Sequence, residues 1–187
     1  MHQPLAMKRP RDHRLGGRPA VFAALALFVV SLGTLLGAWY FQFVVGLAPC
    51  PLCLDQRIPY YITIPLSLLL AIAARARLPH RLVAAGFAVI LVTTLCGAAL
   101  GAYHAGVEWR FWPGPADCTG PLADLRSGGS LFDQLNGVHV VRCDEAAWRF
   151  LGISLAGYNA LISLAMATIA AAGLWALREH PARSQPA

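Results

Sequence analysis

The apolar residues of this 187-residue chain gather into four long stretches that carry no charged side chain. They lie between Arg18 and Asp55, between Arg57 and Arg75, between Arg81 and Glu108, and between Arg149 and Arg178. A helix needs about 20 apolar residues to cross the core of a bilayer, with a range of roughly 17 to 25. All four stretches reach or approach that length. The pattern therefore predicts four membrane-spanning helices, which we place at residues 19–44, 58–74, 82–103 and 150–177.

The composition agrees with an all-α integral membrane protein. Hydrophobic residues make up 57% of the chain and charged residues 13%, whereas a soluble domain carries roughly 25% charged residues. The net charge of +6 could suggest a nucleic-acid partner, but the charges sit at the ends of the apolar stretches, which indicates membrane topology instead. A cleaved signal peptide is an alternative for the first stretch, although its apolar run from Ala20 to Val45 is too long for one.

Basic residues divide unevenly between the two sides of the predicted membrane. The N-terminal tail, the connection between the second and third spans and the C-terminal tail share one side and hold ten basic and two acidic residues. The other side holds five basic and seven acidic residues. Because basic residues mark the cytoplasmic side, we expect the tails 1–18 and 180–187 in the cytoplasm. The predicted fold is a four-transmembrane-helix bundle with outward connections at 45–57 and 104–149, the second of them long.

Four of the five cysteines fall in or beside these outward connections. Cys50 and Cys53 form a CxxC motif where the second span begins, and Cys118 and Cys143 flank the long connection. Disulfides persist outside the cytoplasm, and a helix N-terminus favours the thiolate that carries out dithiol chemistry. Two alternatives stay open, a zinc site of four thiolates and a set of static disulfides. Cys96 lies inside the third span, where we expect an inert, buried thiol.

Two polar residues are predicted to lie near the CxxC motif. Arg57 follows Cys53 by four positions and shares its helical face if the second span has begun. It could stabilise a thiolate or an oxygen anion on a bound acceptor. His104 ends the third span at the same membrane face and could supply a proton. Both residues also have simpler interpretations, as a snorkelling arginine and a polar residue at the interface.

Two other patterns predict structure rather than chemistry. Gly97 and Gly101 form a small-xxx-small motif, which permits close approach of two helices. Asp144 and Glu145 precede an apolar run and predict a helix start, with acids in its first turn.

The motifs and their order resemble the bacterial disulfide bond formation protein B family, DsbB. The resemblance covers residues 21–177, and it rests on Pro49–Cys53 with Arg57, His104, Pro113–Cys118, Cys143–Glu145 and Trp148–Gly152. It implies a protein-disulfide:quinone oxidoreductase of the bacterial inner membrane that acts as a monomer. The partner implied is a periplasmic DsbA-like protein with a thioredoxin fold, which the enzyme would reoxidise.

The resemblance also implies a path for the electrons. Cys118 and Cys143 would accept them from the partner through a mixed disulfide. Cys50 and Cys53 would reoxidise that pair and be reoxidised by ubiquinone or menaquinone, with Cys53 nearest the quinone.

By the same resemblance, Arg57 would lie beside the quinone ring and His104 on the quinone side of the site. The vitamin K epoxide reductase type is an alternative that also joins a CxxC motif, a loop cysteine pair and a quinone. That type places its loop pair before its CxxC motif, whereas here the CxxC motif comes first.

Overall fold

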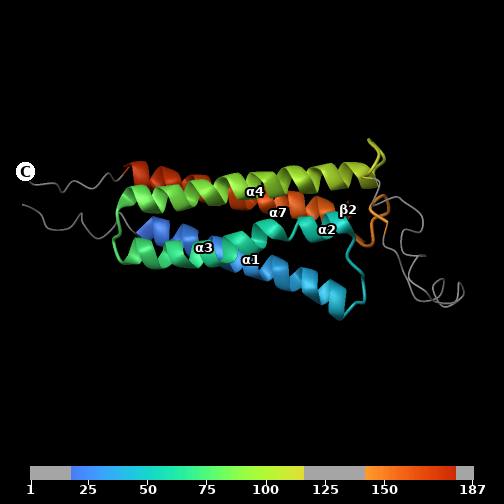
Figure 1. Ribbon diagram of the computed structural model, residues 1–187, viewed down its shortest axis with the longest axis horizontal. Helices are drawn as coiled ribbons and strands as arrows, with labels where there is room; N and C mark the ends of the chain where they lie inside the picture. Colours follow the sequence, from blue (N-terminus) through green and yellow to red (C-terminus); the bar gives the residue numbers. More distant parts are fainter. Residues whose placement is uncertain (1–17, 116–141, 180–187) are drawn as a thin grey trace, which may run out of the picture.

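The computed structural model describes residues 18–115 and 142–179. Four long helices form a bundle (Figure 1): α1 (Arg18–Phe43), α3 (Ile58–Arg75), α4 (His80–Glu108) and α7 (Leu155–Glu179). A short helix, α2 (Pro51–Asp55), precedes α3. Two short antiparallel strands, β1 (Arg149–Phe150) and β2 (Ile153–Ser154), form a hairpin ahead of α7.

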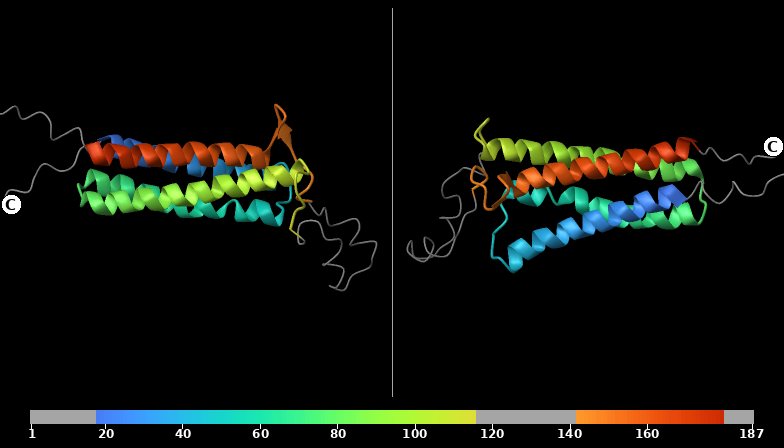
Figure 2. Two further views of the ribbon diagram at one scale, coloured as in Figure 1. Left: turned by 90° about the horizontal axis from the view of Figure 1, so that it is seen from above. Right: turned by 180° about the vertical axis from the view of Figure 1, so that it is seen from behind.

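Each long helix packs against two others in a closed ring. α1 and α4 both contact α3 and α7. α1 begins and α7 ends at the same end of the bundle, which the turn between α3 and α4 also occupies (Figures 1 and 2). We call it the basic end, because Arg75, Arg77 and Arg81 lie there. The opposite end carries Cys50 and Cys53 and is called the thiol end; α1 diverges from the other helices toward it (Figures 1 and 2).

Small residues form the seam between α4 and α7. A Cβ atom added at Gly101 would lie 2.8 Å from the backbone nitrogen of Ala160 and 3.0 Å from its Cα atom. One added at Gly97 would lie 3.1 Å from Pro59 and 3.2 Å from the hydroxyl of Ser163. The packing role predicted for the small-xxx-small motif is therefore confirmed, because Gly101 lies against the backbone of α7 and Gly97 lies against side chains of α3 and α7.

Large apolar side chains cover the outside of the bundle. Phe22, Val29, Leu69, Val92 and Trp175 are between 61% and 65% exposed. Such a surface would be unstable in water and is normal against lipid. All four long segments are long and apolar enough to cross a membrane. The chain is a multi-pass membrane protein, and the predicted four-helix architecture is confirmed.

The last span starts later than the sequence predicts, at Leu155 rather than at residue 150. Leu151 and Gly152 both have positive φ, 49° and 82°, which is the requirement of the tight turns that join two strands. Ser154 then begins α7, because its hydroxyl accepts a hydrogen bond from the N–H of Gly157 at 3.2 Å. The helix start predicted at Asp144 is wrong, since residues 143–145 form a turn.

Two differences between the structure and the prediction from the sequence concern α4. The helix continues beyond the predicted end at residue 103 and includes Glu108. Cys96 is free and exposed on its outer surface, so the expectation of a buried thiol is wrong. The reason is geometric: Gly97 and Gly101 take the inward face of the helix, and Cys96 therefore points outward from the bundle.

Candidate active site

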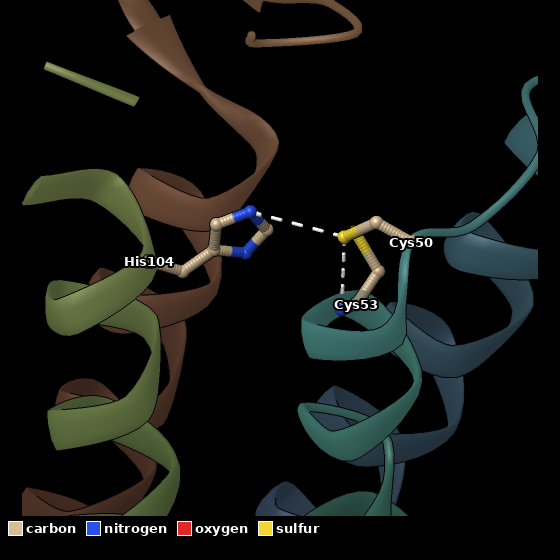
Figure 3. Close-up of side chains that lie close together, drawn as sticks. All are labelled: Cys50, Cys53 and His104. Carbon is tan, nitrogen blue, oxygen red and sulfur yellow. Dashed lines mark hydrogen bonds between the residues drawn. The ribbon is translucent and has the colours of Figure 1, made fainter. Parts of the chain in front are cut away.

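Cys50 and Cys53 lie at the start of α2 (Figure 3). Cys50 is the N-cap residue with an extended backbone, and Pro51 follows in the first turn, where its missing N–H costs nothing. The Cys50 sulfur accepts a hydrogen bond from the N–H of Cys53 at 3.2 Å. The two sulfurs are 2.6 Å apart. Both thiols are free, and a small displacement would join them in a disulfide.

The two sulfurs differ in accessibility. Cys50 is only 2% exposed, whereas Cys53 is partly exposed. The hydrogen bond shared with the sulfur of Cys53, together with burial, raises the pKa of the Cys50 thiol. Cys50 therefore keeps its proton at neutral pH. Cys53 is the sulfur that an external reactant reaches first.

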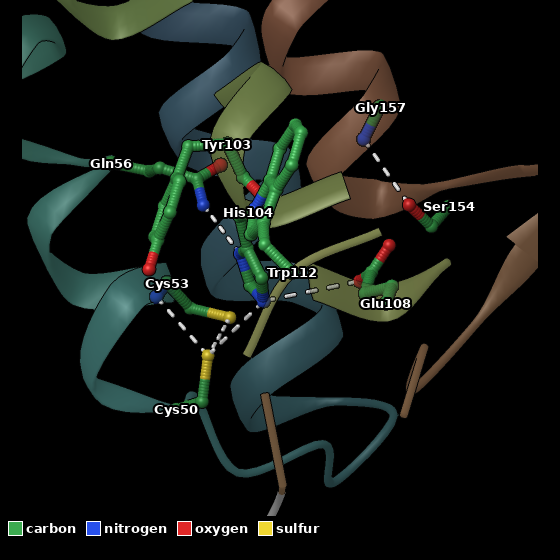
Figure 4. A network of polar contacts seen from close by, with 9 residues as sticks. All are labelled: Cys50, Cys53, Gln56, Tyr103, His104, Glu108, Trp112, Ser154 and Gly157. Carbon is green, nitrogen blue, oxygen red and sulfur yellow. Dashed lines mark hydrogen bonds and ion pairs between the residues drawn. The ribbon is translucent and has the colours of Figure 1, made fainter. Parts of the chain in front are cut away.

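A histidine from α4 faces the cysteine pair (Figures 3 and 4). The Nε2 atom of His104 lies 3.8 Å from the sulfur of Cys50. Its Nδ1 atom lies 2.6 Å from the side-chain amide of Gln56, which holds the ring in place. One turn further along α4, the Oε1 atom of Glu108 lies 4.0 Å from the same Nε2 atom. All three of these polar side chains are buried at the thiol end.

A second group of polar side chains joins α3 to its neighbours. Arg57 donates a hydrogen bond from Nη1 to Oε1 of Gln42 on α1 at 2.6 Å. The hydroxyl of Tyr60 donates to Oδ1 of Asn159 on α7 at 2.6 Å. The Nδ2 atom of Asn159 is buried and has no hydrogen-bond partner among the residues that the structure describes. A buried donor without a partner is costly, which marks this atom as a candidate ligand contact.

These groups line one cavity of about 420 Å³ at the thiol end, bounded by α1, α2, α3, α4 and α7. Aromatic rings form one of its walls. Phe41 of α1 and Trp148 have ring centroids 5.1 Å apart, and Trp148 stacks on Phe150 of the hairpin at 5.9 Å. Tyr158 of α7 continues the row. The cavity thus offers a flat, apolar wall and a few polar groups beside two thiols, as small-molecule sites usually do.

Cys143 belongs to the same neighbourhood. It is fully buried and packs in one cluster with Cys50, Leu52 and Val107. Cys143 is disulfide-bonded, whereas Cys50, Cys53 and Cys96 are free. Cys118 lies outside the described residues.

Three donor atoms of the kind that zinc prefers, from Cys50, Cys53 and His104, lie within 4.8 Å of one another. The sulfurs are too close for a shared ion: two thiolates bound tetrahedrally at 2.3 Å stand about 3.8 Å apart, against 2.6 Å here. A site of four thiolates would also need Cys143, whose sulfur is in a disulfide. The geometry fits dithiol chemistry better than zinc.

Comparison with known proteins settles the family. The family model described as "Disulfide bond formation protein DsbB" matches residues 20–173, most of the chain. The chain belongs to the DsbB family. Membership implies a role in disulfide bond formation and makes the chain a member of an oxidoreductase family.

Several known proteins match this chain over most of their length. Disulfide bond formation protein B 1 of Pseudomonas fluorescens is 32% identical over 165 residues, which cover 84% of this chain and 90% of that protein. Disulfide bond formation protein B of Aromatoleum aromaticum is 30% identical over 147 residues, with 78% and 86% covered. An uncharacterized protein of Rickettsia prowazekii is 28% identical over 145 residues, with 76% and 80% covered. No solved structure matches the chain.

The predicted site residues can now be located in this DsbB-family fold. Cys50, Cys53, Arg57 and His104 line one cavity, and Cys143 packs against the CxxC pair. Asp55 is exposed and forms no ion pair with Arg57 in the described part of the chain.

Four polar residues at the site escaped the sequence analysis: Gln42, Gln56, Glu108 and Asn159. Gln42 and Asn159 interrupt apolar spans, and polar residues inside a span often mark functional sites. Glu108 follows His104 by one helical turn, but that signal required knowing that α4 continues past residue 103. Gln56 carried no signal, because its inward direction depends on where α2 ends.

Proposed function

We propose that this DsbB-family protein is a quinone-dependent thiol oxidoreductase that reoxidises a periplasmic DsbA-like protein. The observation that carries the proposal is the cavity beside Cys53, which joins an accessible thiol to an apolar, aromatic-walled space. In this proposal electrons pass from the partner to Cys118 and Cys143, then to Cys50 and Cys53, and finally to ubiquinone or menaquinone.

The residues of the cavity fit a quinone. A quinone head group is flat and apolar with two carbonyl oxygens, so it needs a flat wall and hydrogen-bond donors. Trp148 and Phe150 supply the wall, and the unpartnered Nδ2 atom of Asn159 is a donor without an acceptor. Arg57, held by Gln42, is a second donor that lines the same space. A bound quinone supplies the two-electron oxidising capacity that the side chains lack.

The position of Cys143 supports a direct relay between the two cysteine pairs. Thiol–disulfide exchange requires that a thiolate reach a disulfide sulfur. Cys143 packs in the cluster that contains Cys50, and the partly buried Cys53 packs against the same cluster. In this proposal Cys50, the more buried of the two, exchanges with Cys143. Cys53 lies on the cavity side and would pass the electrons on. In this order Cys118, which we take as the disulfide partner of Cys143, is the residue that meets the external dithiol.

The distribution of charge supports the proposed orientation. Arg75, Arg77 and Arg81 lie at the basic end, where α1 begins and α7 ends. Basic residues stay on the cytoplasmic side of bacterial membranes. The tails 1–18 and 180–187 would then be cytoplasmic, and the thiol end of the 19–179 membrane domain would face the periplasm of a bacterial inner membrane.

The test is anaerobic quinone reduction by the purified protein with a reduced DsbA-like partner. Quinol should form in proportion to partner disulfide. Replacing Cys50 or Cys53 with alanine should abolish turnover, whereas Cys96→Ala, on the lipid-facing surface of α4, should leave it intact. Unchanged turnover in the Cys50 or Cys53 variant would refute the assignment.

Metal analysis of the same preparation tests the zinc alternative, since a stoichiometric zinc ion would contradict the dithiol role.

A further inference from the structure

The proposed electron path leaves one buried carboxyl group without a role. Glu108, the last residue of α4, is 9% exposed. Its Oε2 atom is buried and has no hydrogen-bond partner among the described residues. Within the same residues its one ion-pair contact is with His104, at 4.0 Å. A carboxyl group buried in this way costs free energy, so its presence beside two thiols calls for a function.

The imidazole of His104 stands between this carboxyl group and the buried thiol (Figure 4). Its Nε2 atom lies 3.8 Å from the sulfur of Cys50 and 4.0 Å from Oε1 of Glu108. Gln56 holds the other ring nitrogen at 2.6 Å. A half-turn of the Gln56 amide presents either NH₂ or oxygen to that nitrogen, so the same contact suits both tautomers of the ring. The ring also has a hydrogen bond with the backbone of Cys143. His104 can carry a proton on Nε2 or, when that proton is given up, accept one there.

The electrostatic surroundings suit a group that changes its protonation state. Several titratable or charged residues face Glu108 or line the same cavity: His104 on α4, Cys53 on α2, Arg57 ahead of α3, Arg149 on the hairpin, and Arg142 and Glu145 beside it. Ser154, at the start of α7, also approaches the carboxyl group. None of the arginines lies within ion-pair distance of Glu108 in the described part of the chain, so no fixed cation locks the carboxylate in its charged form.

Oxidation of the CxxC pair requires a proton acceptor for Cys50. When the Cys50–Cys53 bond forms, two electrons leave for the acceptor and each thiol gives up a proton. The buried Cys50 thiol holds its proton, because its pKa is raised. Only the thiolate attacks, so this proton must be removed as the bond closes. The nearest base that could take it is Nε2 of His104.

We propose that Glu108 is the proton store of this site, taking the proton of Cys50 through Nε2 of His104 when the disulfide closes and returning it when the disulfide opens. The inference deepens the proposed function but needs only the CxxC chemistry, not the quinone. In the proposed reaction the quinol takes one proton from Cys53 and one from water, while Glu108 keeps the proton of Cys50. With a soluble oxidant the group that leaves in the second step takes its proton from water.

The test uses an oxidant other than quinone, so that it stands apart from the proposed function. The reduced full-length protein is mixed with 2,2′-dipyridyl disulfide, and quenched samples are resolved by peptide mass spectrometry. The accessible Cys53 forms a mixed disulfide first and releases one pyridine thione. Cys50 then loses its proton, attacks the Cys53 sulfur and releases the second thione. The rate of this second step is measured from pH 5 to 9 in the wild type, Glu108→Gln, Glu108→Asp and a matched control.

Glu108→Gln should slow the second step at pH 7 by at least about tenfold, within the range of general acid–base catalysis. Its rate should rise roughly tenfold per pH unit, because solvent hydroxide must then take the proton. The wild-type rate should level off, and Glu108→Asp should keep part of it. Asp55→Asn, the same change at an exposed carboxylate near the pair, should behave as the wild type.

The first step is the internal reference for the second, because mixed-disulfide formation on Cys53 should not be slowed by Glu108→Gln. A second step with wild-type rate and pH profile in Glu108→Gln would overturn the proposal. So would equal slowing at every pH, which indicates a structural effect. An infrared difference spectrum of the dithiol and disulfide forms gives a readout other than rate. A carboxylic-acid band that changes on oxidation should be present in the wild type and in Asp55→Asn, and missing in Glu108→Gln. Its absence from the wild type would also contradict the proposal.

Discussion

Replacing Gly101 with alanine should destabilise the bundle by forcing α4 and α7 apart. The added methyl group would lie 2.8 Å from the Ala160 nitrogen, about 0.6 Å inside ordinary van der Waals contact, which begins at 3.4 Å. The neighbour is backbone and cannot rotate away. Overpacking of this kind costs about 1–3 kcal/mol. The higher helix propensity of alanine offsets only about 0.5–1 kcal/mol of that.

Gly33 provides the matched control, because a Cβ atom added there meets nothing within 4 Å. Gly33→Ala should be neutral or slightly stabilising. The measurement is the free energy of unfolding of each variant in mixed detergent micelles, obtained by titration with a denaturing detergent. Equal stability of Gly101→Ala and the wild type would refute the packing argument, as would equal destabilisation by the two substitutions.

The same substitution should also disturb the site. His104 follows Gly101 by one turn on α4, and its 3.8 Å contact with Cys50 depends on the position of that helix. Gly101→Ala should therefore slow closure of the CxxC disulfide by the soluble oxidant, whereas Gly33→Ala should not. A normal closure rate in a measurably destabilised Gly101→Ala protein would show that His104 is held by contacts other than the α4–α7 seam.

Three further predictions concern the cavity and the thiols. Asn159→Leu should raise the KM for quinone by up to about tenfold with little change in kcat, since it removes one hydrogen bond worth about 0.5–1.5 kcal/mol. Steady-state kinetics at saturating partner would measure the two constants separately. Arg57→Met should raise the same KM by about 10- to 100-fold, because a charged donor is worth about 1.5–3 kcal/mol, and an unchanged KM would place the quinone elsewhere. In the reduced protein, iodoacetamide should modify Cys53 well before Cys50 at pH 7, and modification of Cys50 should rise with pH, because its pKa is raised. Peptide mass spectrometry across pH measures both; equal labelling of the two cysteines would contradict the assignment of Cys53 as the more reactive thiol.

Much of the membrane architecture could be read from the sequence, because bilayer thickness imposes a length and a composition on each span. The four charge-free stretches correspond to α1, α3, α4 and α7. The small-xxx-small motif at Gly97 and Gly101 also identified a helix contact, since close packing in lipid depends on small residues. The ends of the helices were harder to predict from the sequence. The hairpin at residues 149–154 depends on two positive φ angles, and an apolar run that ends in a tight turn looks the same in sequence as one that continues a helix.

The CxxC pair could be named as a candidate because its spacing is informative on its own, whereas the roles given to Arg57 and His104 came from the resemblance to the DsbB family. Their common cavity could not be predicted, since it arises where α1 diverges from the other helices at the thiol end. The hydrogen-bond partners of these side chains could not be predicted either, because they are far apart in the sequence. The separations are 15 positions for Arg57 and Gln42, 99 for Tyr60 and Asn159, and 48 for His104 and Gln56.

The sequence by itself therefore determined that this chain crosses a membrane four times and carries its cysteine motif at one end of the spans. Those properties follow from local composition, which a bilayer selects directly. Only the tertiary structure decided that Glu108 lies buried behind His104 and that Cys143 packs with Cys50. The physical reason is that a side chain's surroundings depend on how helices rotate and pack against one another. In the sequence, Glu108 is only a charged residue at the end of a span. The packing of the helices places its carboxyl group beside the thiols, where it can hold a proton.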